Sequence, residues 1–164
     1  ELVRAEHIEQ LLKVLINNFD YVIIDTAPLY NDINLAVLEA SDRIVLVLNQ
    51  DLTTLKHVKT AQNILKALNY ASKAKILLNQ QNSEGIKIKE LENTLNVSLM
   101  AIIPDDQKTV KSAINKGVPF VMGQPYAKIS SCVSELMDLL DLAIAKGTQE
   151  PERKRSMVSR LFSF

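Results

Sequence analysis

The sequence predicts an α/β fold in which helices cover both faces of a mostly parallel sheet. Short apolar runs alternate with longer segments of helical periodicity along most of the chain, and this alternation indicates βαβ crossovers. The apolar runs are almost continuous, as in IVLVL at residues 44–48. Such strands are typical of sheets that are covered on both sides, because neither face can carry polar residues.

The elements can be placed in order from the first residues. Residues 6–18 predict a helix, since one face collects the apolar residues Ile8, Leu11, Leu12, Leu15 and Ile16. Strands are expected over residues 21–25, 44–48, 74–79 and 99–103, where Pro104 stops the last one. Helices are expected over residues 34–40, 52–68, 88–95, 109–116 and 129–145. Gly117 suits the end of the fourth of these helices.

Composition limits the classes of function. Lysine plus arginine equals aspartate plus glutamate at 19 each, so we predict no specific nucleic-acid partner, which usually needs a basic surface. No apolar run reaches the roughly 18 residues of a membrane span. Cys132 is the single cysteine, and we expect it in the core. A chain without an internal disulfide fits a reducing compartment, here the cytoplasm.

Polar residues follow each of the four expected strands. They are Asp25-Thr26-Ala27-Pro28, Asn49-Gln50-Asp51, Asn79-Gln80-Gln81-Asn82 and Pro104-Asp105-Asp106. The carboxyl ends of parallel strands meet at one edge of the sheet, and ligands bind at that edge in open α/β folds. The sequence therefore predicts a site along this edge.

Asp25 is the sharpest candidate within that site. Four apolar residues followed by an aspartate form the Walker-B pattern, in which a carboxylate binds Mg²⁺ directly or through water. The alternative is that Asp25 only caps the next segment or begins a turn. Asp51 has the position of a helix N-cap, while Asp105 and Asp106 precede a helix whose dipole they complement.

Several spaced motifs carry a resemblance to a known family. They are FDYVIIDTAP, LAVLEASDRIVLVLNQDLTTLKHVKTAQNIL, ILLNQQNSEGIKIKELENTL and IPDDQKTVKSAINKGVPFV, in this order. Over about residues 17–145 the chain resembles the ParA/MinD superfamily of deviant Walker-type P-loop ATPases, in the part that follows the phosphate loop. Its DL-x-x-L-K, LLN-x-x-N-x-x-G-I and IPDD elements are most similar to the CpaE/TadZ branch, which positions tight-adherence (type IVc) pilus machinery at a cell pole.

The resemblance implies ATP and Mg²⁺ as cofactors of the complete protein. Asp25 would be the Walker-B acid near Mg²⁺, and Thr26 and Pro28 would lie in the segment that senses the γ-phosphate. The adenine pocket would be formed by the side chain of Asn79 and by backbone groups of Pro104, Asp105 and Asp106. Gln80 stands where the superfamily often has an arginine, so the resemblance does not imply the contacts of that arginine for this chain. Asn79 has an alternative interpretation as a residue that begins a loop.

No segment of the sequence has the pattern of the phosphate-binding half of such a site. The four glycines, Gly85, Gly117, Gly123 and Gly147, form no Gly-rich loop with its lysines. We therefore expect residues 1–147 to be the C-terminal portion of a ParA/MinD-like domain, with residues missing upstream. The absent strand would lie between residues 21–25 and 44–48. This chain alone should not hydrolyse ATP, whereas the parent protein would be a weak ATPase.

Residues 148–164 form a separate segment, a linker followed by a basic amphipathic pattern. Four basic residues stand against two acidic ones, and a helix of this kind suits a membrane interface or a partner groove. The residues expected at the membrane are Arg153, Lys154, Met157, Val158, Arg160, Leu161, Phe162 and Phe164. The alternatives are an ordinary terminal helix and a disordered end.

Three functions are compatible with these features. The first is a nucleotide-dependent homodimer that localises or assembles pilus or secretion machinery at the inner face of the cell membrane. The second is a non-enzymatic positioning scaffold with a degenerate nucleotide site. The third is a MinD-like regulator of division-site placement. A flavodoxin-like or receiver domain is disfavoured, because the early acidic cluster of a receiver is absent from the sequence.

Overall fold

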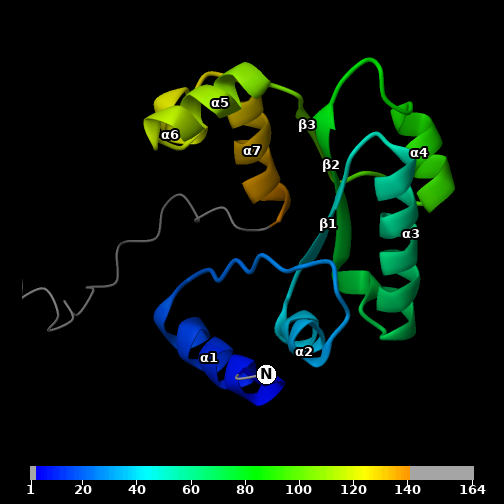
Figure 1. Cartoon of the computed structure of the whole chain (residues 1–164), viewed down its shortest axis with the longest axis vertical. Helices are drawn as coiled ribbons and strands as arrows, with labels where there is room; N and C mark the ends of the chain where they lie inside the picture. Colours follow the sequence, from blue (N-terminus) through cyan, green and yellow to red (C-terminus); the bar gives the residue numbers. More distant parts are fainter. Residues whose placement is uncertain (1–2, 141–164) are drawn as a thin grey trace, which may run out of the picture.

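A parallel sheet of three strands forms the centre of the molecule (Figure 1). The computed structural model describes residues 3–140 of the chain. The strands are β1 (Ile44–Leu48), β2 (Ala74–Gln81) and β3 (Ala101–Pro104), in the order β1-β2-β3. β1 pairs with β2 and β2 pairs with β3, both in parallel. The predicted α/β class with a parallel sheet is confirmed.

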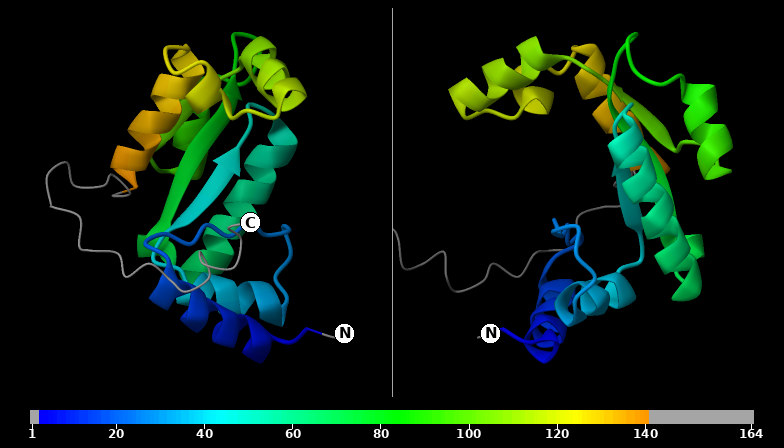
Figure 2. Two further views of the ribbon diagram at one scale, coloured as in Figure 1. Left: turned by 90° about the vertical axis from the view of Figure 1, so that its left-hand side faces the viewer. Right: turned by 45° about the vertical axis from the view of Figure 1, so that its right-hand side comes forward.

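Helices lie on both faces of the sheet. α3 and α4 lie side by side on one face, and α7 lies on the other (Figures 1 and 2). At the start of the described chain, α1 and α2 pack against each other. The helices are α1 (Ala5–Asn18), α2 (Asp32–Ala40), α3 (Leu52–Ala67), the 3₁₀ turn η1 (Ala71–Lys73), α4 (Ile88–Leu95), α5 (Gln107–Lys116), α6 (Phe120–Gly123) and α7 (Lys128–Leu139). No helix among residues 3–140 is long and apolar enough to cross a membrane.

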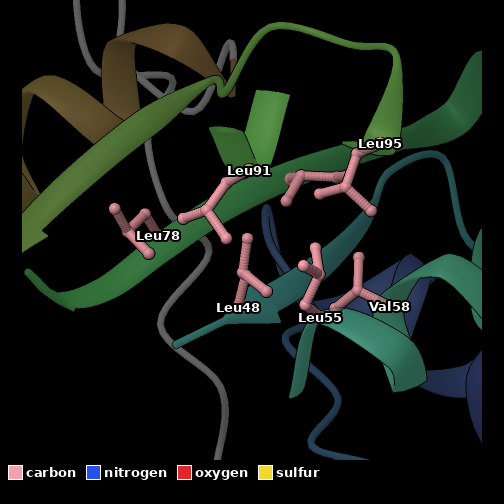
Figure 3. Packing of buried hydrophobic residues seen from close by; sticks show 7 residues of the cluster. Leu48, Leu55, Val58, Leu78, Leu91 and Leu95 are labelled. Carbon is pink, nitrogen blue, oxygen red and sulfur yellow. The ribbon is translucent and has the colours of Figure 1, made fainter. Parts of the chain in front are cut away.

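The main hydrophobic core fills the space between the sheet and the layer of α3 and α4 (Figure 3). Ile76 and Leu78 of β2 face this layer together, because residues two apart in a strand point to the same side. The buried members of the core are Leu48, Leu55, Val58, Ile76, Leu78, Leu91 and Leu95. Each buried leucine stabilises the fold by about 1.5–3 kcal/mol relative to an exposed one, so this cluster fixes α3 and α4 on the sheet.

A second, smaller cluster lies between the sheet and α7. Its buried members are Leu77, Ile103 and Ile129, and Cys132 of α7 packs against them while remaining half-buried. The expected core position of the cysteine is therefore confirmed. The cover over this face does not extend to the end of β1, where the side chain of Val47 is 51% exposed.

The strand expected over residues 21–25 is not formed, and this prediction is wrong for the described structure. These residues run without strand hydrogen bonds, and the exposed fractions of Tyr21, Ile23 and Ile24 are 44%, 88% and 38%. The apolar run alone does not make a strand, because its N–H and C=O groups need a neighbouring chain. Within residues 3–140, β1 pairs only with β2 and ends the sheet on the side where this segment was expected.

The helix expected over residues 6–18 is confirmed as α1, but its apolar face is largely uncovered. Leu12 is buried, as the apolar face predicts, and α1 packs against α2. In contrast, Leu11 is 51% exposed and Ile16 is 59% exposed. α2 covers only part of the apolar stripe, so the structure leaves an apolar surface on α1 beside the exposed segment 21–25.

The other expected boundaries hold to within a few residues. β1 and α4 have the expected bounds, and β2 continues two residues further than expected, to Gln81. Pro104 closes β3 from within the strand, which is possible because β3 is an edge strand. η1 and α6 were not predicted. Residues 141–164 lie outside the described part of the chain, and so do the end of the expected helix 129–145, the domain boundary at residue 147 and the basic segment.

Candidate functional site

Three of the four polar strand ends meet at one edge of the sheet. The carboxyl ends of β1, β2 and β3 lie together at the top of Figure 1, as parallel pairing requires. Leu48 pairs with Leu78, so the next residues, Asn49 just after β1 and Asn79 within β2, occupy neighbouring positions. The fourth end is not part of this group. The segment that holds Asp25 lies level with the opposite, amino-terminal part of the sheet in Figures 1 and 2.

Asn79 sits at an irregularity in β2. The register with β3 shifts between Leu78 and Gln81, and Gln80 has a left-handed backbone with a φ of 53°. A bulge of this kind bends the strand and changes the direction of its side chains. Asn79 is half-buried, and no residue within 3–140 donates to or accepts from its amide. The amide of Asn79 is therefore available to a ligand at this edge.

The start of the β3–α5 segment lies beside the end of β2. The N–H of Asp105 donates to the carbonyl of Gln81 at 3.0 Å, which ties the end of β3 to the end of β2. The carboxylate of Asp105 is exposed and lies 3.4 Å from Nε2 of Gln107. Among the described residues, the backbone around Pro104 and Asp105 is thus held against the end of β2.

Two acidic residues near this edge act as helix caps. Asp51 accepts hydrogen bonds from the N–H and Oγ1 of Thr54, both at 2.7 Å, and begins α3. Asp106 accepts from the N–H of Thr109 at 3.0 Å and begins α5. The pKa of each carboxyl is lowered, mainly by the hydrogen bond from the threonine side chain. The cap interpretation of Asp51 is confirmed, and Asp106 has the same role.

Gln50 organises the edge, and the sequence analysis did not single it out. Its Nε2 donates to the carbonyl of Ile86 at 2.9 Å, and its Oε1 accepts from the N–H of Asn82 at 2.7 Å. The side chain of Asn82 in turn accepts from the N–H groups of Glu84 and Gly85. The sequence contains one signal for this arrangement, because Gly85 is an isolated glycine at the end of the polar loop that follows β2.

Asn49 carries an unsatisfied acceptor at the same edge. Its Oδ1 is buried, and no donor reaches it within residues 3–140. A buried polar atom without a partner is unfavourable and rare in folded proteins. A water molecule or a ligand donor is therefore expected beside Asn49.

Asp25 and the residues after it form an exposed segment that α2 holds in place. Nδ2 of Asn34 donates to the carbonyls of Ala27 and Leu29 at 2.9 and 2.7 Å. Asn31 caps α2 by accepting from the N–H of Asn34 at 2.9 Å. The side chains of Asp25, Thr26 and Pro28 are exposed. Sequence reasoning missed the two asparagines that fix this turn.

The residues present fit one half of a nucleotide site and not the other. A free amide, an unsatisfied acceptor and a fixed backbone edge suit a nucleobase, which presents donors and acceptors. A triphosphate needs a cradle of backbone N–H groups with lysines, and no glycine among residues 3–140 forms one. Gly85 packs against Gln50, and Gly117 ends α5.

No group of three or more His, Cys, Asp or Glu side chains in the described chain could hold a metal ion. A single exposed carboxylate at Asp25 remains suitable for Mg²⁺, which keeps most of its waters.

Comparison with solved structures decides the fold. The ParA family ATPase from Chlorobium tepidum TLS superimposes with a TM-score of 0.75 at 20% identity, over 81% of this chain and 55% of that one. The MinC:MinD cell division protein complex of Aquifex aeolicus gives a TM-score of 0.74 at 17% identity, over 92% of this chain and 64% of that one. The chain has the fold of the ParA and MinD ATPases.

Sequence comparison points to the same group. An AAA domain family model matches residues 2–78. The septum site-determining protein MinD of Synechocystis sp. is 30% identical over 129 residues, which are 74% of this chain and 47% of that protein. The chain spans about half the length of the curated MinD relatives it matches. A MinD structure from Pyrococcus horikoshii OT3 with a TM-score of 0.70 and 21% identity is a complex with Mg-ADP.

Proposed function

We propose that this chain is the second half of a ParA/MinD-type nucleotide-binding domain and that its sheet edge holds the adenine base of ATP. The observation that carries the proposal is the free amide of Asn79 at the bulge of β2, beside the backbone at Asp105 that is fixed to Gln81. An amide side chain can donate to one atom and accept from another, which matches the paired donor and acceptor on the adenine edge.

The phosphate side of the site would come from a strand and loop outside this chain. The support is the apolar surface left beside the sheet. Ile23 is 88% exposed, and Val47 of the edge strand β1 is 51% exposed. An unpaired strand edge with apolar neighbours is unfavourable in water. A strand inserted between β1 and residues 21–25 would cover both, and it would bring Asp25 to the carboxyl edge, where it would bind Mg²⁺.

The complete protein would be a nucleotide-controlled switch. ATP would be held between two subunits, and the dimer would recruit partners at the membrane through the basic residues 153–164. Two basic segments, one from each subunit, bind a surface far better than one, so dimerisation would control attachment. Hydrolysis would be transfer of the γ-phosphoryl group to water, by positioning and charge stabilisation.

Two biological roles have support. The similarity to septum site-determining MinD proteins favours regulation of division-site placement. The DL-x-x-L-K element at residues 51–56 and the LLN-x-x-N-x-x-G-I element at residues 77–86 favour the pilus branch. Deletion in the native host separates the two roles, because misplaced septa indicate the first and loss of tight-adherence pili indicates the second.

The first test is MgATP binding by calorimetry. The chain of 164 residues is compared with a protein extended upstream through the expected phosphate loop. The longer protein should bind MgATP and the shorter one should not. Asn79→Ala should then weaken ATP binding about tenfold, the value of one or two hydrogen bonds. Asn115→Ala, an exposed asparagine on α5, is the matched control and should leave binding unchanged.

The main rival is a scaffold with a degenerate nucleotide site. It predicts that neither protein binds MgATP, although the longer one folds and still reaches its partners. That result would end the ATPase proposal. Binding that Asn79→Ala and Asn115→Ala affect equally would instead remove Asn79 from the adenine site.

A further inference from the structure

The segment from α5 to α6 carries exposed apolar side chains that the proposed nucleotide site does not use. α5 and α6 pack against each other and project from the top of the sheet, on the side of α7 (Figures 1 and 2). The exposed fractions are 72% for Ile114, 74% for Met122 and 98% for Tyr126, while Val118 and Val121 are 42% and 37% exposed. We call these five residues the α5–α6 surface. A group of large apolar side chains in water marks an interaction site.

A buried serine fixes the position of α6. Ser130 at the start of α7 is 1% exposed, and its Oγ lies 2.7 Å from the carbonyl oxygen of Gln124 and 3.3 Å from that of Phe120. The side chain of Phe120 packs inward against the cluster beneath α7. Both ends of α6 are therefore held on α7, and the exposure of Met122 is a consequence of this packing.

The same part of the chain is basic. Residues 107–134 contain four lysines and no aspartate or glutamate, although the whole chain has 19 residues of each sign. Lys108 lies near the carboxylate of Asp106, the cap of α5. The side chains of the other three, Lys111, Lys116 and Lys128, are exposed. The α5–α6 surface thus lies in a region of net positive charge.

Lysines and apolar residues alternate along this surface. Lys111 and Ile114 are three positions apart on α5, and residues at that spacing are neighbours on a helix. Thr109, on the inner side of the same helix, is buried. Lys128 follows the exposed Tyr126 by two residues. Ammonium groups and apolar side chains are therefore presented together on the outside of the molecule.

We propose that the α5–α6 surface binds an anionic lipid bilayer. The negative potential of such a bilayer attracts lysines, and apolar side chains beside them enter the boundary between headgroups and acyl chains. Tyrosine suits this boundary, because its ring is apolar and its hydroxyl stays in water. A nucleic acid would attract the lysines through its phosphates but would leave Ile114 and Met122 in water.

This contact is separate from the other sites proposed for the protein. It includes neither the edge with Asn79 and Asp105 nor the basic residues 153–164. The upstream strand of the proposed function would lie beside β1, whereas α5 and α6 follow β3 at the other edge of the sheet. That strand would leave the α5–α6 surface exposed. The proposal therefore does not rest on the nucleotide site.

The first test is cosedimentation of the full chain with vesicles of phosphatidylglycerol and phosphatidylcholine in equal amounts. To remove the charge of the terminal segment, Arg153, Lys154, Arg155 and Arg160 are replaced by glutamine. This neutral-tail protein should still bind. Adding Lys111→Gln/Lys116→Gln should weaken binding about tenfold or more, because each lysine near an anionic surface contributes roughly fivefold. Lys56→Gln/Lys89→Gln, which changes two exposed lysines on α3 and α4, is the matched control and should change binding by less than about twofold.

Two further arms test insertion of the apolar side chains. Met122 and Leu52 are both 74% exposed, so Met122→Ser should weaken vesicle binding several-fold and Leu52→Ser should leave it unchanged. The chain contains no tryptophan, which makes tyrosine emission measurable. Lipids with brominated acyl chains should quench part of this emission, and Tyr126→Phe should remove the quenched part.

The proposal is overturned if the neutral-tail protein does not bind the vesicles, or if the two lysine pairs weaken binding equally. It is also overturned if Tyr126→Phe leaves the quenching unchanged. Binding to double-stranded DNA without binding to vesicles, lost in Lys111→Gln/Lys116→Gln, would assign the surface to nucleic acid instead. If the neutral-tail protein binds as well as the unchanged chain, residues 153–164 lose their proposed membrane role and the α5–α6 contact stands. None of these results bears on the proposed ATP site, which calorimetry tests separately.

Discussion

The side chain of Gln50 rests directly on Gly85. A Cβ atom at residue 85 would overlap with the Cβ of Gln50 and would lie 3.0 Å from its Cδ. The same glutamine bonds the backbone of Asn82 and Ile86 on either side of the glycine. One side chain at the end of β1 therefore holds the loop after β2, and it can do so because residue 85 has no side chain.

Gly85→Ala is predicted to destabilise the protein by about 1–3 kcal/mol, as expected for added volume at a packed position. Because Gln50 would have to move, its bonds to Asn82 and Ile86 would weaken together. Urea unfolding followed by circular dichroism measures the change in the free energy of unfolding.

Two variants serve as controls for Gly85→Ala. Gly123→Ala makes the same chemical change where the new Cβ would meet Val118 at an ordinary 3.4 Å, and it should cost less than about 0.5 kcal/mol. In a Gln50→Gly background the overlap with Cβ is gone, so Gly85→Ala should cost much less there. An equal cost in both backgrounds would show that the contact with Gln50 is not the cause.

Leu91→Ala is predicted to be strongly destabilising. Leu91 is fully buried between α4 and the sheet, and removing such a side chain leaves a cavity that costs about 2–5 kcal/mol. Leu52→Ala is the matched control, since the side chain of Leu52 at the start of α3 is 74% exposed and its loss should cost less than about 0.5 kcal/mol. Thermal unfolding of both variants separates the core from the surface, and similar losses would contradict the core in Figure 3.

The sequence predicts the sheet and its helices well where the signal is local. The bounds of β1 and α4 agree with the expectation, because the apolar pattern of each element is followed directly by polar residues. The caps at Asp51 and Asp106 depend only on residues three positions away. Such features require no knowledge of the rest of the fold.

The failures that bear most on the site involve partners that are distant in the chain. Residues 21–25 have the composition of a buried strand, yet Ile23 is exposed because no described strand lies beside it. Gln50 bonds to loop residues more than thirty positions away. The spacing of apolar residues in the sequence does not predict a hydrogen bond between such distant residues. The bulge at Asn79 and Gln80 arises from the pairing of β2 with β3. Each of these features depends on which segments meet, and a single sequence does not specify that.

The cap at Asp51 predicts a specific pH dependence of stability. Its hydrogen bonds from Thr54 lower the pKa of the carboxyl below 3.8 in the folded protein. A depressed folded pKa gives stability that is present above the unfolded pKa and is lost as the pH falls through the folded pKa. The contribution of Asp51 should therefore be complete at neutral pH and should decrease below about pH 4.

Asp51→Asn and Asp51→Ala separate the charge from the cap. Asparagine can still accept from the N–H of Thr54, so Asp51→Asn should retain most of the stability at pH 7 but lose this part of its pH dependence. Asp51→Ala should cost about 1 kcal/mol at pH 7, the usual value of an N-cap. Urea unfolding at pH 7 and pH 3 measures both. An unchanged pH dependence in Asp51→Asn would remove the carboxylate as its source.

Ile23 tests whether the exposed segment 21–25 becomes a strand when the rest of the proposed domain is present. In the chain of 164 residues its side chain is 88% exposed, so Ile23→Ala should change the free energy of unfolding by less than about 0.5 kcal/mol. In a protein extended upstream through the expected phosphate-loop strand, Ile23 would be buried, and the same change should cost about 2–5 kcal/mol. Ile114→Ala is the matched control, because Ile114 on α5 is 72% exposed and is remote from the expected strand; its effect should be small in both proteins. If Ile23→Ala is equally mild in the two proteins, the added chain does not pair with residues 21–25, and Asp25 loses its proposed route to the carboxyl edge of the sheet.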